Sequence, residues 1–390
     1  GPRHRARSRL LRDLRSSAAG GTLPFGGTAD GLIWSLVVST DRVTEVAPEQ
    51  LAFDANLFQC AFWARFKQMR RTPTQAFHIH HNGRRYPLVV VHRRITADAS
   101  LGYAPLGPDV ILPTEDQGPF LERVAEELRD QVPTTCRFLR FDLPWRNPYT
   151  DSGDWDEPPE ARVREMRMNY GCRHWNLHKA PSDLHAPDTV ILDLERSPDE
   201  LLRAMHKKHR YCTRAASRRG VEVTIAAREQ LPAWHRLYLD TAERRGIVAE
   251  TLDYFLELFA TARQHDPELR LYLAHRNGKL LAGSVVGFVG SSAYYLFSAS
   301  SPSGRSLFAS FAVVWRAICD AGAAGCRRFD LMGIPPDPRP GHPMHGLYRF
   351  KTRFGGTLRH RRGCWDYPLD ERSYAALALA GDLQNAFHRR

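Results

Sequence analysis

Residues 271–279 read Leu271-Tyr-Leu-Ala-His275-Arg276-Asn277-Gly278-Lys279, an extended apolar run that ends on Asn-Gly. A second extended run, 281–289, follows it directly. Strand, Asn-Gly and strand together are the strongest short-range signal for a β-hairpin. The same order, with the turn signature His-x-Asn-Gly-basic, occurs at 77–92. A helical pattern precedes each hairpin, at 57–69 and at 252–264, so the sequence predicts a duplicated α/β unit.

The chain between these hairpins contains a predicted boundary. From Arg146 to Pro187, Pro, Gly, Asp and Trp are dense and periodicity fades. We expect four parts: a flexible basic arm over 1–30, a first domain over 31–180, a second domain over 181–372 and a C-terminal helix over 373–390.

Three further elements are predicted from local patterns. The first strand is expected at 32–38, and the strand 189–194 opens the second half. Ser197-Pro198-Asp199-Glu200 then starts a helix, because Ser caps it and Pro fits its first turn. This helix is expected to run to about Arg219 and to stop at Gly220.

The composition points to an anionic partner. Lys and Arg outnumber Asp and Glu by 55 to 43, a formal net charge of +12. That excess favours nucleic acid, nucleotide phosphates or an acidic membrane surface. The basic arm suits contact with RNA or anionic lipid, and equally a solvated tail.

The cellular compartment can be inferred from the absence of membrane-spanning and signal-peptide patterns and from the cysteines. No run approaches the roughly 18 to 20 apolar residues of a membrane span, and no signal-peptide core is present. Seven scattered cysteines without a C-x-x-C pair favour reduced thiols over a disulfide framework or a zinc ribbon. We expect a cytoplasmic protein, with peripheral contact at the anionic inner membrane face as one use of its positive charge.

The densest positive charge lies at 206–219. At helical spacing Lys207, Arg210 and Arg214 share one face, and Lys208 lies beside it. A stripe of like charge costs stability unless an anion neutralises it, and Arg is shaped for bidentate phosphate contacts. Tyr211 suits stacking on a base or packing in the core. A solvated helix face is the alternative interpretation.

A second cluster is expected in the last strands. Asp330 and Gly333 end an apolar strand and suit a turn that faces a cleft. Phe350 and the glycine pair 355–356 would bring backbone close to a ligand. Lys351 would be a cation in an apolar setting, where it stabilises negative charge more strongly than in water. In the alternative, Lys351 reaches solvent and the glycines only make a turn.

Other site signatures are weak. His78, His80 and His81 suggest a metal, but strand alternation sends His80 and His81 to opposite faces and no carboxylate completes the set. We therefore predict no metal and no cofactor. The chain has neither a G-x-x-x-x-G-K-[ST] loop nor a G-x-S-x-G elbow.

An ordered series of motifs resembles the Fem family of peptidoglycan bridge-peptide transferases (FemA, FemB and FemX), over about residues 55 to 370. The matching segments are Phe58-Gln59-x-x-x-Trp63-x-x-x-Lys67, Tyr103-Ala-Pro-Leu-Gly107-Pro108, the strand 189–194, Lys208-x-Arg210-Tyr211 with Arg214-Ala215, Thr241-Ala-Glu-Arg-Arg245, Phe329-Asp330-x-x-Gly333 and Phe350-Lys351-x-x-Phe354-Gly355-Gly356.

The sequence also departs from the family pattern. Cys212-Thr213 replaces the usual Asn-Ile, and the family's Gln-Pro is absent around His185-Ala186-Pro187. No long charged helical hairpin separates the two halves, so the chain resembles the FemX type more closely.

The resemblance implies an α/β fold of two tandem GNAT-like acyltransferase domains, with mixed sheets flanked by helices. It also implies an aminoacyl-tRNA donor and an acceptor amine on a peptidoglycan precursor, either lipid II or UDP-MurNAc-pentapeptide. An aminoacyl ester is already activated, so no nucleophilic Ser or Cys is required. Such an enzyme aligns the amine with the carbonyl and stabilises the negative oxygen.

The resemblance also implies site residues, at the positions of this sequence that match the family's motifs. The substrate-binding candidates are Lys67, Tyr103, Lys208, Arg210, Tyr211, Arg214, Gly333 and Phe350. Among them, Lys67 and the basic helix face are candidates for the precursor's phosphates. Lys351 is the candidate for stabilising the oxyanion. Asp330 either orients Lys351, accepts a proton or only ends its strand.

Two other functions are weighed. A GNAT-type enzyme that uses acyl-CoA needs a glycine-rich loop that opens a helix, whose N–H groups hold the pyrophosphate. The best candidate, 300–306, has one glycine and a proline. A non-catalytic RNA-binding protein built on the basic helix predicts that Lys351→Ala leaves every activity intact.

Overall fold

The computed structural model describes residues 41–52, 56–150, 159–262, 267–335 and 339–380. The basic arm and the strand predicted at 32–38 lie outside the described residues, as does the end of the predicted C-terminal helix. None of the helices in these ranges has the length and apolar character that a bilayer-spanning segment needs.

The strands form one hydrogen-bonded path in the order β1-β2-β3-β4-β5-β13-β7-β12-β11-β10-β9-β8, and β6 pairs with β13 beside it. The strands are β1 (Arg42–Val46), β2 (Thr74–His81), β3 (Arg84–Arg94), β4 (Ser100–Ala104), β5 (Cys136–Arg146), β6 (His178–Lys179), β7 (Asp188–Asp193), β8 (Glu222–Ala226), β9 (Glu268–Arg276), β10 (Lys279–Val289), β11 (Ser292–Ser300), β12 (Arg328–Asp330) and β13 (Thr357–Pro368).

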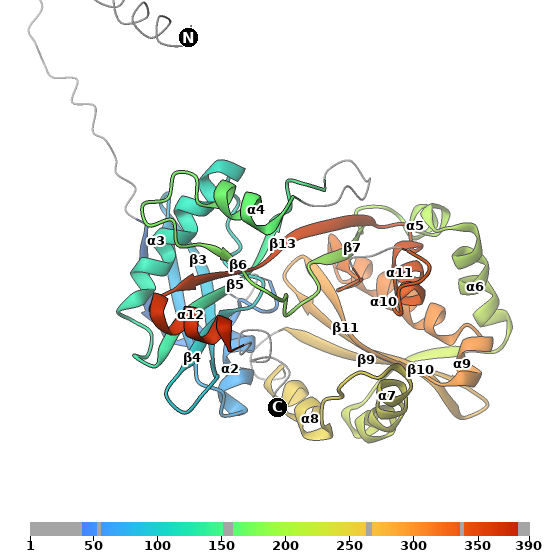
Figure 1. Cartoon of the computed structure of the whole chain (residues 1–390). Helices are drawn as coiled ribbons and strands as arrows, with labels where there is room; N and C mark the ends of the chain where they lie inside the picture. Colours follow the sequence, from blue (N-terminus) through green and yellow to red (C-terminus); the bar gives the residue numbers. More distant parts are fainter. Residues whose placement is uncertain (1–40, 53–55, 151–158, 263–266, 336–338, 381–390) are drawn as a thin grey trace, which may run out of the picture. The chain divides into compact units, whose positions relative to one another are not determined.

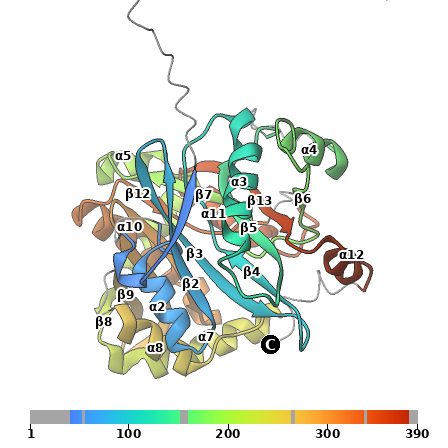
Figure 2. The ribbon, with the colours of Figure 1, turned by 90° about the vertical axis from the view of Figure 1, so that its left-hand side faces the viewer.

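Helices cover this mixed sheet (Figures 1 and 2). The helices are α2 (Ala61–Met69), α3 (Gln117–Arg129), α4 (Ala161–Met168), α5 (Pro198–Ala204), α6 (Lys207–Arg218), α7 (Leu231–Arg245), α8 (Leu252–Ala262), α9 (Pro302–Ser306), α10 (Ala309–Ala323), α11 (His345–Thr352) and α12 (Glu371–Leu379).

The predicted duplication is confirmed by the topology. In the first repeat (residues 42–146), the antiparallel run β2-β3-β4 is followed by α3 and by β5, which is parallel to β4. In the second repeat (residues 222–330), the antiparallel run β9-β10-β11 is followed by α10 and by β12, which is parallel to β11. A parallel pair requires a crossover, and a helix supplies it in both repeats.

Both predicted hairpins are present. Asn82 and Gly83 join β2 to β3 with φ values of 49° and 72°, and Asn277 and Gly278 join β9 to β10 with φ values of 49° and 73°. Two successive positive φ angles define the turn whose twist matches paired strands, and Asn-Gly adopts it readily.

The helix predicted from Ser197 to about Arg219 is instead two helices, α5 and α6. Ser197 and Glu200 form the expected capping box. The chain then leaves helical geometry at Met205, with ψ 147°, and the backbone N–H of His206 donates to the carbonyl of Arg353. The ring Nδ1 of His206 accepts from the N–H of Lys208 and caps α6. A distant backbone partner therefore ends the first helix.

The prediction that residues 348–354 lie in the last strands is also wrong, because most of them form α11. The rings of Phe350 and Phe354 lie 5.1 Å apart and both pack near Phe311 of α10. These aromatic residues therefore pack α11 and the residues after it against α10, and they do not alternate between the two faces of a strand.

Strand β13 joins the two parts of the sheet (Figure 1). Its first residues pair with β7, and its later residues pair with β5. Arg140 of β5 donates to both carboxylate oxygens of Asp366 at 2.6 and 2.7 Å, and both side chains are fully buried. The Tyr374 hydroxyl of α12 donates to the same carboxylate. The domain limits predicted at 180 and 372 remain predictions.

One hydrophobic core is shared by the two repeats. It combines buried residues of α2 with those of α7, α8 and β9–β11. Phe66 of α2 meets Tyr254 of α8 edge-on at 5.0 Å, and Arg70 forms an ion pair with Glu257 at 2.5 Å. This packing fixes α2 next to the second repeat, and the cavity described below lies beside it.

Candidate functional site

A cavity of about 280 Å³ lies beside this shared core. Residues of α2, β3, β4 and α8 line it, together with His185 from the segment before β7 and Met332 from the segment after β12. Most of the lining is aromatic or aliphatic. The charged side chains that line it are Lys67, Arg93 and Glu250. A mainly apolar wall with few polar groups is the usual character of a small-molecule site.

Lys67 is one of the predicted residues that line this cavity. It lies one turn after Trp63 in α2, and its ammonium is 4.5 Å from the centre of the Trp63 ring. A cation over an aromatic face is attracted by the negative face of the ring. Burial lowers the pKa of Lys67 to about 8, the positive charge of Arg93 acts in the same direction, and Glu250 opposes it.

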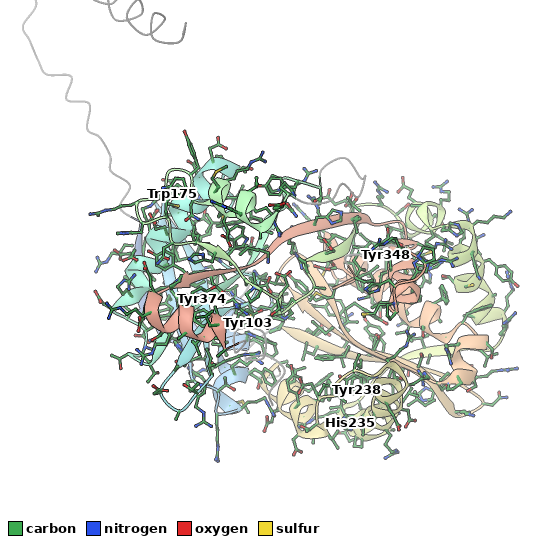
Figure 3. All side chains as sticks on the ribbon, in the orientation of Figure 1. Tyr103, Trp175, His235, Tyr238, Tyr348 and Tyr374 are labelled. Atoms are coloured by element: carbon green, nitrogen blue, oxygen red, sulfur yellow. The ribbon has the colours of Figure 1, made fainter. Side chains whose placement is uncertain are left out.

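Tyr103, also predicted, lies at the junction of the two repeats in the view of Figure 3 and lines the same cavity. Its hydroxyl donates to Oδ2 of Asp142 at 3.0 Å, and it lies 2.8 Å from Nδ1 of His185. The same Asp142 oxygen is 2.9 Å from His185 Nδ1. Burial and the Asp142 carboxylate raise the pKa of Tyr103 well above its usual value.

Sequence reasoning missed His185 and Asp142 as site residues. No motif marks Asp142, and His185 stands in the sequence only where the family's Gln-Pro is absent. His185 and Asp142 are 43 positions apart, and the parallel pairing of β4 with β5 places Tyr103 opposite Arg140, two residues before Asp142. No local signal in the sequence reports such a meeting.

Lys351 lies in α11 with 7% of its surface exposed. Its ammonium donates to the carbonyl of Met332 at 3.2 Å and to that of Gly333 at 2.8 Å. Burial lowers the pKa of Lys351 to about 8, and the nearby Asp330 carboxylate opposes that shift. Lys351 is not among the residues that line the cavity, but it holds the segment whose Met332 does.

Asp330 and Gly333 shape this same segment. Asp330 accepts hydrogen bonds from the hydroxyl of Thr189, from the N–H of Met332 at 2.7 Å and from Arg361 at 2.8 Å. These bonds hold the turn after β12, in which Met332 has a φ of 58°. A Cβ on Gly333 would lie 2.7 Å from that of Ala186, so the glycine permits a close approach of the two segments.

The predicted basic face lies on α6, away from the lining of this cavity. Lys208 and Arg214 are exposed, whereas Arg210 is half-buried and donates to the carbonyl of Arg203 at 2.9 Å. Tyr211 is 53% exposed, and its ring meets that of Phe308 edge-on at 6.2 Å.

Phe350 belongs to the core near α6 rather than to the cavity. Its carbonyl accepts a hydrogen bond from His209 Nε2 at 2.9 Å. The structure therefore brings Lys67 and Tyr103 together and places Gly333 and Lys351 at one edge of their cavity. It keeps the α6 side chains apart.

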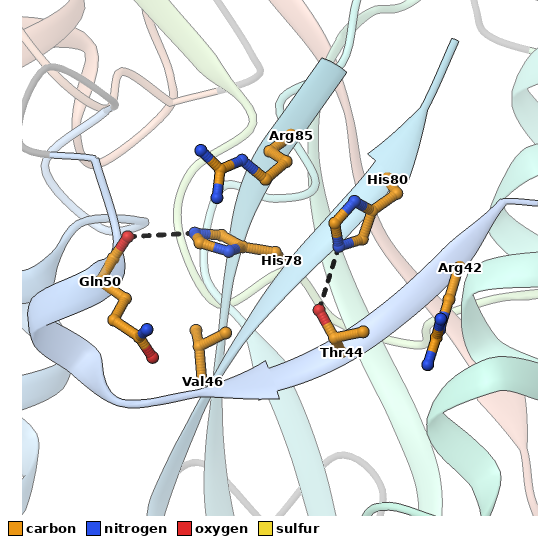
Figure 4. Close-up of a pocket in the computed structure, with 7 residues that line it drawn as sticks. All are labelled: Arg42, Thr44, Val46, Gln50, His78, His80 and Arg85. Carbon is orange, nitrogen blue, oxygen red and sulfur yellow. Dashed lines mark hydrogen bonds between the residues drawn. The ribbon is translucent and has the colours of Figure 1, made fainter. Parts of the chain in front are cut away.

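A second, more open cavity of about 590 Å³ lies over β1–β3 (Figure 4). The cross-strand neighbours Arg42, His80 and Arg85 line it, and His80 Nε2 lies 3.1 Å from the Thr44 hydroxyl. His81 pairs instead with Asp41 at 2.5 Å. In the described part of the chain, no group of three or more His, Cys, Asp or Glu side chains is placed to hold a metal ion.

The segment 300–306, the candidate for CoA, contains the last residue of β11, the N-cap Ser301 and the short helix α9. Its Ser301 hydroxyl accepts from the N–H of Gly304 at 2.9 Å. A Cβ on Gly304 would lie 2.3 Å from the carbonyl oxygen of Leu281, so the glycine serves packing against β10. The N–H that a pyrophosphate would need is used by the helix's own cap.

Comparisons with known proteins agree with this architecture. Residues 203–352 match the family described as the acetyltransferase (GNAT) domain. Lipid II:glycine glycyltransferase of Staphylococcus haemolyticus is 22% identical over 249 residues, and that of Staphylococcus aureus is 24% identical over 251 residues. These alignments cover 48% of this chain and 59% and 60% of the relatives, so the chain spans only part of their length.

A solved structure also matches. The crystal structure of FemX superposes with a TM-score of 0.68 at 17% identity, covering 83% of this chain and 95% of that chain. Together with the duplicated topology, these matches show that the chain has an α/β fold of two tandem GNAT-like domains, and that it is similar to FemX and to the lipid II:glycine glycyltransferases.

Proposed function

We propose that this protein is an acyltransferase that moves an amino acid from aminoacyl-tRNA to an amine of a peptidoglycan precursor. The observation that carries the proposal is the cavity in which Lys67, Tyr103 and the Met332 segment meet. The sequence relatives named lipid II:glycine glycyltransferase support lipid II as the acceptor class. UDP-MurNAc-pentapeptide, which presents the same amine, is the other candidate.

The cavity suits an acceptor that joins an apolar or sugar surface to phosphate. Aromatic rings supply contact area, while Lys67 and Arg93 place positive charge in the same wall. Within a low-dielectric wall a cation attracts phosphate more strongly than it does in water. The α6 face, with Lys208 and Arg214 exposed, is the proposed surface for further phosphates of the precursor.

Lys351 is proposed to stabilise the oxyanion. An ammonium has three N–H donors, and the carbonyls of Met332 and Gly333 take two. We propose that the third is donated to the carbonyl oxygen of the aminoacyl ester as this oxygen becomes negative. Asp330 positions this group by holding the turn after β12.

The thiols argue against a covalent acyl-enzyme. All seven cysteines are free, and six of them are buried. Burial raises the pKa of Cys319, the half-buried one, to about 11, and raises the pKa of the other six thiols as well. A thiol that stays protonated is a poor nucleophile. Direct attack of the amine on the activated ester fits this chain better.

The surface charge fits the setting of such a reaction. A formal net charge of +12 would attract the protein both to tRNA and to an anionic membrane surface, the two settings that this reaction requires.

The experiment is transfer of radiolabelled amino acid from a total aminoacyl-tRNA pool to lipid II and, in parallel, to UDP-MurNAc-pentapeptide. We expect label in one of the two precursors, and the better acceptor identifies the substrate. If the folded protein transfers no label to either, while binding acetyl-CoA in calorimetry, the proposal is wrong and an acyl-CoA reaction replaces it.

A further inference from the structure

Three polar groups meet at one point of the cavity wall. Nδ1 of His185, the hydroxyl of Tyr103 and Oδ2 of Asp142 lie within 2.8 to 3.0 Å of one another. They come from three separate segments: the strands β4 and β5 and the irregular segment before β7. Such an arrangement holds an imidazole ring in one orientation.

We propose that His185 is the general base that takes the proton from the attacking amine, with Asp142 and Tyr103 as its positioning residues. This inference rests on the proposed function. It assigns the proton acceptor to His185 rather than to Asp330, whose carboxylate already accepts hydrogen bonds from Thr189, Met332 N–H and Arg361.

The hydrogen bonds determine which ring nitrogen is available. Asp142 Oδ2 accepts from the Tyr103 hydroxyl, and a carboxylate can also accept from Nδ1–H of His185. With its proton on Nδ1, the neutral ring leaves Nε2 as the acceptor. The Asp–His pairing of catalytic triads fixes the tautomer in the same way.

The two side chains of this pair differ in their burial. The Asp142 side chain is fully buried, whereas that of His185 is 30% exposed. The ion-pair partner that the described residues give Asp142 is His185. A buried carboxylate without a cation is costly, so the imidazolium formed during the reaction would be the cation that lies beside Asp142.

His185 lines the cavity in which the proposed function places the substrate. The centres of the His185 and Phe58 rings lie 5.1 Å apart, and Nδ1 of His185 points toward Asp142. The titratable and charged groups that face it or share the cavity are Tyr103, Asp142, Lys67, Arg93, Glu250 and Tyr254.

The amine lone pair forms a C–N bond to the ester carbonyl carbon, and the carbonyl electrons move to oxygen. Nε2 of His185 takes one proton from that nitrogen. When the intermediate collapses, the ester C–O bond breaks with its electron pair, and the ribose oxygen receives the proton from the imidazolium. His185 is neutral again at the end.

The test uses His185→Asn in the transfer assay, with wild-type activity established first. Asn keeps an N–H donor near the position of Nδ1 and removes Nε2. We expect kcat to fall by about 100-fold or more, with little change in KM. The ratio of wild-type to variant kcat should rise with pH and then level off, following one ionisation. Because titration of the substrate amine cancels in this ratio, a merely structural role would give a constant ratio.

The matched control is His81→Asn. His81 forms a similar pair with Asp41 at 2.5 Å, but on β2 and outside the cavity. Its kcat and pH profile should remain those of the wild type. As a second readout, added imidazole should restore more activity to His185→Ala than to Lys351→Ala.

Two outcomes are kept distinct. A wild-type protein without any transfer activity contradicts the proposed function. An active wild type, with a His185→Asn variant whose kcat is within threefold or whose ratio does not change with pH, contradicts the role of His185 alone.

Discussion

The ammonium of Lys351 donates a hydrogen bond to the carbonyl of Gly333 at 2.8 Å, and to the neighbouring carbonyl of Met332 at 3.2 Å. The cation therefore supports the turn after β12, whose Met332 side chain lines the cavity. Lys351, the most buried lysine among the predicted site residues, is therefore hydrogen-bonded to the segment that forms part of the cavity wall.

Replacing Lys351 by Met should lower kcat by about 100- to 1000-fold, the usual loss for one oxyanion donor, with a smaller change in KM. The wild-type kcat should also fall as pH rises through about 8, because the ammonium form is the active one. Saturating acceptor keeps the titration of Lys67, a binding residue, out of this measurement. Lys279→Ala, an exposed lysine on the β9–β10 hairpin, is the control. Equal losses in kcat and in substrate affinity would count against an oxyanion role.

The α6 face gives a prediction about salt. Arg214 is exposed, whereas Arg210 also donates to a backbone carbonyl, so Arg214→Ala removes charge with less structural cost. If α6 holds phosphates, Arg214→Ala should weaken binding of the precursor most strongly at low salt, because screening weakens exposed charge interactions. Binding curves at several salt concentrations measure this, with exposed Arg276→Ala as the control. If the loss of affinity in Arg214→Ala is the same at every salt concentration, α6 does not bind the phosphates of the precursor.

The buried pair Arg140–Asp366 gives a prediction about stability. Asp366→Ala leaves a fully buried guanidinium without its carboxylate, which should cost about 3–5 kcal/mol of unfolding free energy. Glu257→Ala breaks the part-exposed pair with Arg70 and should cost less than about 1 kcal/mol. Chemical denaturation of both variants tests the contrast. Similar losses would mean that β13 is not held by this pair.

Local sequence signals predicted local structure well. Asn82-Gly83 and Asn277-Gly278 require no distant partner to turn the chain, so both hairpins could be predicted, and with them the duplication. The cap at Ser197 could be predicted for the same reason. The break at Met205 could not, because the carbonyl that receives the His206 N–H belongs to Arg353.

The candidate site was partly predictable. Family motifs pointed to Lys67, Tyr103 and Lys351, each of which lies in or beside the cavity wall. His185 lies 82 positions from Tyr103 in an irregular segment, so neither periodicity nor a motif marks it. The aromatic residues around Lys351 suggested a strand, because sequence alone does not show that Phe350 packs on α10.

The last prediction concerns the contact between Gly333 and Ala186. A Cβ on Gly333 would lie 2.7 Å from the Cβ of Ala186, which is closer than real side chains approach, so one segment must move. Ala186 follows His185, and the carbonyl of Gly333 is bonded to Lys351, so the displacement reaches both proposed catalytic groups. Gly333→Ala should therefore lower kcat by about tenfold or more, since small misplacements of reacting groups are costly. Adding Ala186→Gly removes the opposing Cβ and should restore most of the lost rate. Gly322→Ala, at a glycine with open space around it, is the matched control. A double variant as slow as Gly333→Ala alone would show that the steric contact is not what limits the site.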